Sequence, residues 1–179
     1  MIYQPEQDSY MLAKEIEKYI SQLKNKNIQI LDMGSGSGIQ AQTAIKSRIP
    51  KDNVLCADIN PEAIKELKKQ KLKTIKTNLF EKIKNKFDLI VFNPPYLPES
   101  KYDKLPDTTA GKKGYETITE FLKQAKAHLN KDGTILLLFS NLSKPNIILN
   151  KAKSLGYNFE KLSEENAGMM EKLFVYKFY

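Results

Sequence analysis

Apolar residues recur at two spacings along this chain, and the spacing predicts which segments form helices and which form strands. Between residues 9 and 23 they recur every three or four positions, which is the helical period, with Asp8 or Ser9 as the candidate cap. The same period predicts further helices at 39–47, 61–70, 115–129 and 145–155. Short, mainly apolar runs predict strands at 28–33, 54–57, 72–77, 87–92, 134–139, 157–162 and 172–178.

The order of these elements predicts the fold class. Strands and helices alternate as far as residue 139, which is typical of an α/β fold with helices on both faces of a doubly wound, mostly parallel sheet, here of seven strands. Only a short turn at 164–168 separates the last two strands, so we expect an antiparallel hairpin there. The 179 residues fit one domain spanning 1–179. Its long irregular stretch, 97–114, is expected to be a functional loop.

Composition limits the classes of function. The 29 basic residues outnumber the 21 acidic ones and give a net charge of +8, but the lysines are spread as on a solvated helix face, so they indicate a nucleic-acid partner only weakly. Cys56 lies in an apolar run and is expected to be a buried thiol, and a single cysteine excludes disulfides and cysteine-based zinc sites within the chain. The one histidine, His128, is placed at a helix end, and no metal site is expected.

Targeting signals are not evident in the sequence. No apolar run reaches the ~20 residues that cross a bilayer. The first residues do not show a basic segment followed by an apolar one, as a signal peptide does. A cytoplasmic protein without a membrane partner is therefore expected.

The segment Asn93-Pro94-Pro95-Tyr96 follows an apolar strand and carries the most specific chemistry in the sequence. Two prolines end the strand and leave backbone carbonyls without partners in a helix or sheet. The Asn93 side chain adds another carbonyl, and Tyr96 adds a flat ring that can stack on a planar group. Such a site suits an –NH2 group on a planar ligand. The alternative is a proline-rich strand end with no ligand.

A glycine-rich turn follows the first predicted strand. Gly34, Gly36 and Gly38 let the backbone turn tightly and approach a ligand closely. Their spacing differs from Gly-x-Gly-x-x-Gly, the pattern of nicotinamide enzymes. With Asp32 two residues earlier, the turn resembles motif I of S-adenosylmethionine methyltransferases. In that family the acidic residue holds the methionine ammonium, so the resemblance implies this role for Asp32.

Polar residues also follow the second and third predicted strands. Asp58 lies about 20 residues beyond the glycine turn, where an acidic side chain accepts hydrogen bonds from both hydroxyls of a ribose. Asn78 can accept a hydrogen bond from an adenine amino group, although a loop asparagine has other uses. Ligands of open α/β sheets bind at the C-terminal ends of the strands, so this order of polar residues predicts a cofactor site at that edge.

Two further segments narrow the resemblance. Residues 3–12 resemble the Tyr-x-Pro-x-x-Asp-Ser/Thr-x-Leu-Leu opening of HemK-like class I protein-glutamine methyltransferases that lack a separate N-terminal helical domain, the archaeal and eukaryotic release-factor type. Residues 111–116 resemble the Gly-Gly-x-x-Gly-x-Glu segment of the same group, with Ala110 in place of its first glycine. The matches run from Tyr3 to Glu116.

The resemblance implies S-adenosylmethionine as cofactor, with S-adenosylhomocysteine as product. It makes residues 1–27 an N-terminal helical segment over the cofactor and 97–114 a substrate-side lid. The implied cofactor-binding residues are Ser9, Asp32, Gly34, Gly36, Gly38, Asp58, Ile59, Asn78, Leu79 and Asn93. The implied substrate-binding residues are Asn93, Pro94, Pro95 and Tyr96, with Asn93, Pro94 and Tyr96 as the catalytic ones. Two partners are implied: a class I translation release factor, methylated on its Gly-Gly-Gln loop, and a small zinc-binding activator subunit.

The choice of methyl acceptor has physical support. The Asn93 and Pro94 carbonyls can accept the two hydrogens of a glutamine amide while Tyr96 packs on its plane. Methylation of a base in a duplex requires flipping it out, and about 28 residues before the first strand leave no room for a target-recognition domain. An adenine-N6 methyltransferase acting on RNA or DNA is the first alternative. A non-catalytic module that binds RNA or a partner is the second.

Overall fold

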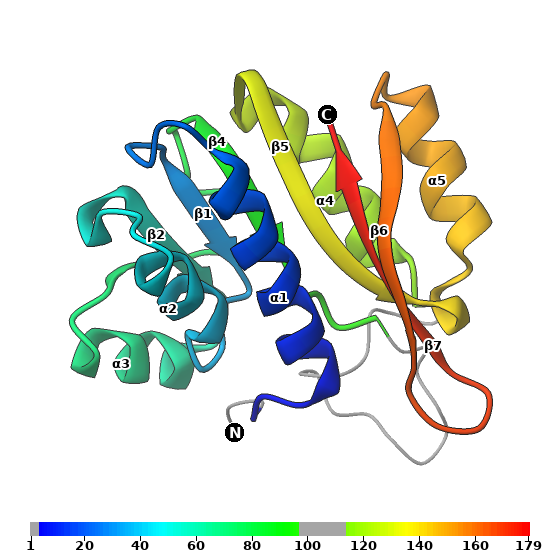
Figure 1. The fold of residues 1–179 in the computed structure, drawn as a ribbon, viewed down its shortest axis with the longest axis horizontal. Helices are drawn as coiled ribbons and strands as arrows, with labels where there is room; N and C mark the ends of the chain where they lie inside the picture. The colour runs from blue at the N-terminus through cyan, green and yellow to red at the C-terminus, as the bar shows by residue number, and fades with distance from the viewer. Residues whose placement is uncertain (1–3, 97–113) are drawn as a thin grey trace.

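The mainly apolar runs of the sequence form one sheet in the computed structural model, which describes residues 4–96 and 114–179. Within these residues the sheet has seven strands in the order β3-β2-β1-β4-β5-β7-β6 (Figure 1). The strands are β1 (Ile30–Met33), β2 (Val54–Asp58), β3 (Lys73–Lys76), β4 (Phe87–Phe92), β5 (Leu129–Ser140), β6 (Phe159–Asn166) and β7 (Lys172–Phe178). β1 to β5 are parallel, and β7 runs antiparallel between β5 and β6. The predicted fold class is confirmed.

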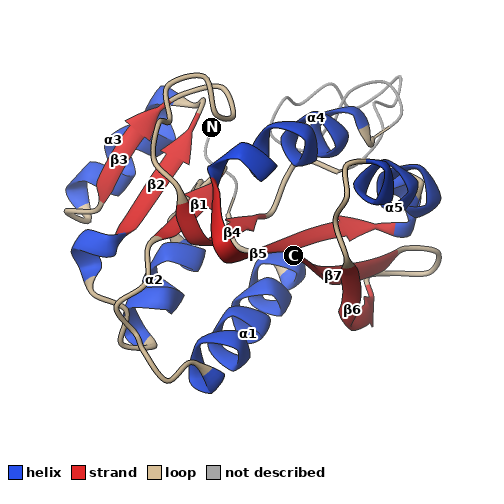
Figure 2. Ribbon diagram, turned by 90° about the horizontal axis from the view of Figure 1, so that it is seen from above, coloured by secondary structure: helices blue, strands red, loops and turns tan. Residues whose placement is uncertain are grey.

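Helices cover both faces of the sheet (Figure 2). On one face lie α1 (Gln7–Gln22), α2 (Ile39–Lys46) and α3 (Pro61–Lys69), and on the other lie α4 (Glu116–Ala125) and α5 (Pro145–Ser154). Successive residues of β1 serve the two faces in turn, because Ile30 packs in the core beneath the first group and Leu31 in the core beneath the second. Burial on both faces explains why β1 is apolar almost throughout.

The start of α1 differs from the expectation. Glu6 occupies the cap position, so Asp8 and Ser9 are not caps and lie in the first turn of the helix. Both side chains are buried, at 4% and 3% exposed. Asp8 Oδ1 accepts from the backbone N–H of Ser9 at 2.6 Å, while its Oδ2 contacts residues that follow β4.

β5 also begins earlier than predicted, at Leu129, five residues before the expected start at Thr134. The expected helix over 115–129 ends at Ala125 and is followed by a short 3-10 helix, Lys126–His128. The pairing of β5 with β4 shifts register between Phe87 and Leu89. The polar segment before Thr134 therefore joins the strand although it lacks the apolar pattern by which strands were predicted. The apolar pattern therefore identified only the regular part of β5.

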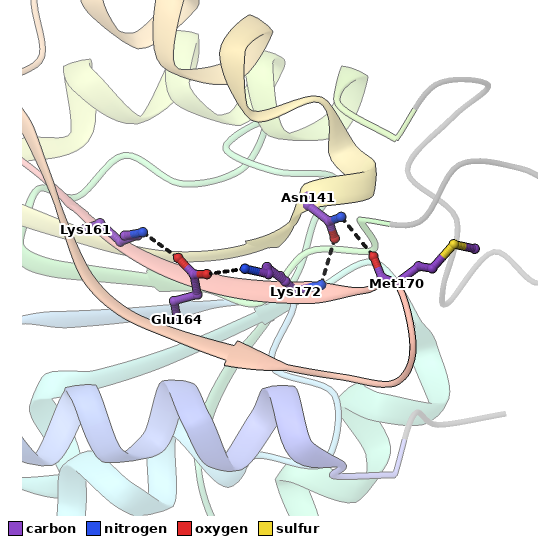
Figure 3. A network of polar contacts seen from close by, with 5 residues as sticks. All are labelled: Asn141, Lys161, Glu164, Met170 and Lys172. Carbon is purple, nitrogen blue, oxygen red and sulfur yellow. Dashed lines mark hydrogen bonds and ion pairs between the residues drawn. The ribbon is translucent and has the colours of Figure 1, made fainter.

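The β6–β7 hairpin has its turn at 167–171, three residues beyond the predicted position, and Ala167 N donates to Glu171 O at 2.8 Å. Figure 3 shows the contacts that fix it. Asn141, just after β5, donates from Nδ2 to Met170 O at 3.0 Å and accepts from Lys172 N at 2.7 Å. The Glu164 carboxylate accepts from Lys161 and Lys172. These bonds hold the turn beside the C-terminal end of β5.

The same hairpin is joined to the first helix. Gln7 Nε2 donates to the backbone carbonyl of Asn166 at 2.9 Å and to Glu165 Oε2 at 3.2 Å. The first turn of α1 therefore lies at the edge of the sheet where the hairpin turns, although the contacts span 158 and 159 positions of the chain.

Three other expectations concern single residues or segments. Cys56 is fully buried, as predicted. His128 ends the 3-10 helix after α4, with Nδ1 3.0 Å from Asn85 O and its ring stacked on Phe80. Among the described residues, no helix combines the length and the apolar character needed to span a membrane.

Candidate active site

The predicted site residues lie at one edge of the sheet. Met33 at the end of β1 pairs with Ala57 of β2 and Phe92 of β4, so the residues that come directly after these three stand at the same level. Gly34, Asp58 and Asn93 occupy these positions. β1 lies between β2 and β4, and the strand order reverses there, which is where ligands bind in open α/β sheets.

The glycine turn after β1 has left-handed backbone at all three glycines, with φ of 63° at Gly34, 49° at Gly36 and 87° at Gly38. A Cβ at Gly38 would lie 2.8 Å from the Leu67 side chain, so this glycine allows close packing between α2 and α3. At Gly36 the nearest atom to such a Cβ is Gly34 O at 3.9 Å, which leaves the backbone there open to a ligand. The turn thus provides both close packing and free space.

Asp58 ends β2 and is 8% exposed. Its Oδ2 accepts from Gly36 N at 2.8 Å and its Oδ1 accepts from Asn60 N at 2.8 Å. Asn60 in turn caps α3, because its side chain accepts from Glu62 N at 2.9 Å and Pro61 fills the first turn. Ile59 between them is exposed. The carboxylate is held at the edge by backbone groups on both sides of the predicted cofactor site.

Asp32 is the most buried carboxylate of the site, at 1% exposed. Its Oδ2 accepts from the backbone N–H of Ala41 in α2 at 3.1 Å. Burial, with a smaller contribution from the negative charge of Asp58, raises the pKa of Asp32 from 3.8 to about 7. A buried carboxylate of this kind becomes fully ionised when a cation binds beside it, which suits an ammonium group.

The remaining cofactor candidates lie in two places. Asn78, two residues after β3, is exposed, and its Nδ2 donates to Glu81 Oε1 at 2.9 Å. Leu79 has a left-handed backbone, with φ of 45°. Ser9 is in the first turn of α1, which precedes the glycine turn in the chain. Its carbonyl accepts from Gln40 Nε2, which follows the glycine turn, at 2.9 Å. Gln40 was not predicted, because a glutamine within a helix gives no signal in the sequence.

The amide of Asn93 is held by one buried carboxylate. Its Nδ2 donates to Asp8 Oδ2 at 2.9 Å, and the Tyr96 hydroxyl lies 3.4 Å from the same oxygen. The Tyr96 backbone carbonyl accepts from Ser143 Oγ at 2.8 Å. Asn93 Oδ1 is buried and receives no hydrogen bond from the described residues. Between Asn93 and Tyr96, Pro94 is buried and Pro95 is half-buried.

Two predictions fall partly outside this description. Of the 97–114 segment, proposed as a lid, Gly114 lies within the described residues, and its φ of 82° is one that favours glycine. In the neighbouring motif, Tyr115 N donates to Glu116 Oε2 at 3.1 Å. The other residues of the segment, and Tyr3 of the N-terminal motif, lie outside the described residues.

Seven strands in this order, with a glycine turn after β1 and carboxylates at the ends of β1 and β2, define a class I methyltransferase with a Rossmann-like sheet. The chain belongs to the methyltransferase small domain family, whose model matches residues 9–162. Family membership makes it a methyltransferase of the HemK-like type, and argues against a non-catalytic binding module.

Relatives with known names are similar along most of the chain. A Methanocaldococcus jannaschii protein provisionally named a protein N5-glutamine methyltransferase is 34% identical over 170 residues, covering 89% of this chain and 82% of the relative. Methyltransferase HEMK2 of Homo sapiens is 28% identical, covering 99% of this chain and 89% of that protein. The match therefore includes nearly the whole of both relatives.

Two solved structures share the fold. A chain of the E. cuniculi Mtq2–Trm112 complex, responsible for methylation of the eRF1 translation termination factor, superposes with a TM-score of 0.79 at 22% identity, covering 99% of this chain and 97% of that one. The T. thermophilus 16S rRNA N2 G1207 methyltransferase, in complex with AdoMet and guanosine, gives a TM-score of 0.67 at 18% identity, covering 97% and 43%. The family is one of methyltransferases, and this last neighbour was solved with AdoMet bound.

Proposed function

We propose that this enzyme methylates the side-chain amide nitrogen of a glutamine in a protein, and that its substrate is the Gly-Gly-Gln loop of a class I translation release factor. The names of the relatives support the proposal. Besides the M. jannaschii protein, a release factor glutamine methyltransferase of Aquifex aeolicus is 34% identical over 125 residues, 59% of this chain and 44% of that protein. Release factors act on ribosomes, so the cytoplasm is the proposed location.

The observation that carries the proposal is the side-chain carbonyl oxygen of Asn93, which has no hydrogen-bond partner within residues 4–96 and 114–179. A buried acceptor without a donor costs about 1–3 kcal/mol, and native proteins keep few such atoms without a function. This one lies directly after β4, at the switch point of the sheet, and its amide nitrogen is already bonded to Asp8. A ligand that brings an N–H group would satisfy it.

A glutamine amide brings two such hydrogens. When bound, S-adenosylmethionine supplies a reactive methyl group on its sulfonium sulfur. Asn93 Oδ1 would accept one hydrogen of the glutamine –NH2 and the Pro94 carbonyl the other, while the Tyr96 ring packs on the amide plane. The nitrogen would gain the methyl group as its bond to the sulfonium sulfur breaks, which leaves S-adenosylhomocysteine, and the nitrogen would lose one proton to water. Positioning and fixed carbonyl dipoles would supply most of the rate.

The residues present fit S-adenosylmethionine. The backbone at Gly36 is open, and buried carboxylates stand at the ends of two neighbouring strands. We assign Asp32 to the methionine ammonium, Asp58 to the ribose hydroxyls and the Asn78 carbonyl oxygen to the adenine amino group. Ser9 would contact the methionine end. The other proposed contacts come from Gly34, Gly36, Gly38, Ile59, Leu79 and Asn93.

A partner subunit is a further part of the proposal. The E. cuniculi neighbour was solved as a complex of Mtq2 with Trm112, which supports a small activator subunit, zinc-binding in the resembling group, for this chain. The resemblance implies that the activator subunit covers an apolar edge of the sheet. β3 forms one edge of the sheet and reads Lys-Thr-Ile-Lys, with Lys73 and Lys76 exposed and Ile75 half-buried. An activator pairing with this edge would thus meet a charged strand.

Adenine-N6 methylation of RNA or DNA is the second candidate. The net charge of +8 favours a nucleic acid, and an adenine amino group presents the same two hydrogens as an amide. A ribosomal RNA small subunit methyltransferase C of Haemophilus influenzae is 33% identical over 129 residues, covering 68% of this chain and 36% of that protein.

The deciding experiment offers the enzyme and labelled methyl donor four acceptors separately: a class I release factor, the same factor with Gly-Gly-Gln changed to Gly-Gly-Glu, duplex DNA, and rRNA or tRNA. We expect label on the parent release factor alone. Label that persists on the Gly-Gly-Glu factor would place methylation at another residue. Label on nucleic acid alone would overturn the proposal.

A further inference from the structure

The carboxylate that holds Asn93 comes from another part of the chain. Asp8 is 85 positions before Asn93, in the first turn of α1, and is 4% exposed. Its Oδ2 receives the Asn93 Nδ2 bond at 2.9 Å and lies 3.4 Å from the Tyr96 hydroxyl. One buried oxygen therefore contacts both polar side chains of the segment that follows β4.

The chemical identity of this contact determines which way the Asn93 amide points. An asparagine side chain has two orientations of nearly equal shape, one with oxygen and one with nitrogen at a given position. Asp8 Oδ2 acts as the hydrogen-bond acceptor in this contact, which favours the orientation with Nδ2 toward Asp8. Oδ1 then takes the other position, where it is buried without a partner among the described residues.

We propose that Asp8 is a positioning residue that keeps the acceptor atom of Asn93, and not its donor, toward the methyl-accepting nitrogen. The inference rests on the proposed function, in which that nitrogen belongs to an –NH2 group. With the Asn93 amide reversed, its Nδ2 group would face the –NH2 group of the substrate, so two donors would meet and Oδ1 would no longer be available as the acceptor. Asp8 touches no substrate atom in this scheme and acts through Asn93 and Tyr96.

A buried carboxylate in α1 can also serve the helix alone, and the chain contains a matched control for that role. Glu15 lies two helical turns beyond Asp8, is 5% exposed, and forms an ion pair with Lys18 at 2.7 Å on the same helix. Replacing Glu15 by Gln removes a buried charge from α1 without touching Asn93.

The test is a double-variant cycle on positions 8 and 93. In Asp8→Asn the new amide can donate to Asn93 Oδ1 and so stabilise the reversed orientation. In Asn93→Asp two carboxylates face each other. In the double variant the amide at position 8 donates to one oxygen of the carboxylate at position 93, which leaves the second oxygen as an acceptor for the substrate.

Turnover at saturating cofactor and acceptor is measured for the five proteins, with thermal stability and cofactor affinity. Asp8→Asn is expected to lose about 100-fold in kcat. The turnover of the double variant is expected to be about tenfold higher than the value obtained by multiplying the losses of the two single variants. Glu15→Gln should keep parental turnover. Cofactor affinity should stay close to the parental value in Asp8→Asn and Glu15→Gln, because neither residue is a proposed cofactor contact.

Parental turnover in Asp8→Asn, or a double variant no better than the product of its singles, would overturn the positioning role. So would an equal loss in Glu15→Gln. The acceptor is whichever substrate the parent methylates. If the parent methylates nucleic acid and not the release factor, the proposed substrate is wrong. The same cycle measured with nucleic acid still tests Asp8, because an adenine –NH2 group also needs Asn93 Oδ1 as its acceptor.

Discussion

Asp58 accepts a hydrogen bond from the backbone N–H of Gly36, with 2.8 Å between Oδ2 and N. This bond ties the end of β2 to the glycine turn that follows β1. Gly36 is also the position where the backbone is open to a ligand. The carboxylate proposed for the ribose therefore shapes the turn that the cofactor must approach, so its loss acts on the cofactor site in two ways.

Asp58→Ala is expected to weaken cofactor binding by about 1.5–3 kcal/mol, the usual value of a hydrogen bond to a charged group. Calorimetric titration with S-adenosylhomocysteine measures the change. Asp88→Ala is the control, because Asp88 also accepts from a backbone N–H, that of Gln29 at 2.7 Å, but lies at the start of β4. Parental affinity in Asp58→Ala would remove the ribose assignment.

The raised pKa of Asp32 predicts a pH dependence of cofactor binding. Below its pKa of about 7 the free carboxyl is protonated, and a bound ammonium requires it ionised, so binding must release a proton there. Affinity should fall by up to about tenfold for each pH unit below 7 and level off above it. Calorimetry between pH 5.5 and 8.5 checks this, and Asp32→Asn should bind weakly at every pH without the slope.

The raised pKa of Asp32 also makes the free energy of unfolding depend on pH. A carboxyl whose pKa is 3.8 in the unfolded chain and about 7 in the folded one binds its proton more tightly when folded. Its contribution to the free energy of unfolding is therefore present below pH 3.8 and lost as pH rises through 7. Asp32→Asn should be more stable than the parent at pH 8, and denaturant unfolding at two pH values measures the difference. An equal difference at pH 4 and pH 8 would contradict the burial argument.

Asn93→Ala should impair transfer far more than binding of the cofactor. It removes the acceptor that faces the reacting amide, and loss of one preorganised polar partner lowers turnover by about 10²–10³-fold. Asn93→Asp keeps an acceptor but places a charge against Asp8, so it should also be slow. Single-turnover transfer to a release factor is the measurement, with thermal unfolding as control. Near-parental turnover in Asn93→Ala at unchanged stability would exclude the mechanism.

Two of the three glycines of the turn, Gly36 and Gly38, should respond differently to alanine. Gly38→Ala adds strain at φ of 87° and places a methyl group 2.8 Å from Leu67, so it should destabilise the fold by more than the ~1–2 kcal/mol of left-handed backbone alone. Gly36→Ala adds the strain without the clash. Its methyl group enters the open space, so cofactor affinity should fall more than stability. Equal losses of stability in the two variants would contradict this division.

The sequence predicted the central strands β1, β2 and β4 because they are buried on both faces and mainly apolar. β4 matches its expected range of 87–92, and the site residues follow strand ends that the apolar runs had marked. β5 was found only in part, since its first residues pair across a register shift and include the exposed Lys131 and Asp132. Local pattern cannot report a pairing that depends on the neighbouring strand.

The polar contacts of the site were less predictable than its strands. Asp8 or Ser9 was expected to cap a helix, because both residue types are common at a helix start, and the bond of Asp8 to Asn93 spans 85 positions. Gln40 gave no signal for the same reason, since its bond to the Ser9 carbonyl spans 31 positions. Contacts between side chains distant in sequence become visible only when the fold brings their strands and helices together.

The contact of Gln7 with the β6–β7 hairpin also affects the order of folding. α1 is made well before its partners, Glu165 and Asn166, which lie 158 and 159 positions further along the chain. β7 follows β6 in the chain but must enter between β5 and β6. Pairings between distant segments form slowly, so we expect this edge of the sheet to be completed only after β7 has been made. A chain that lacks β7 should thus be inactive and prone to aggregate through the unpaired side of β5.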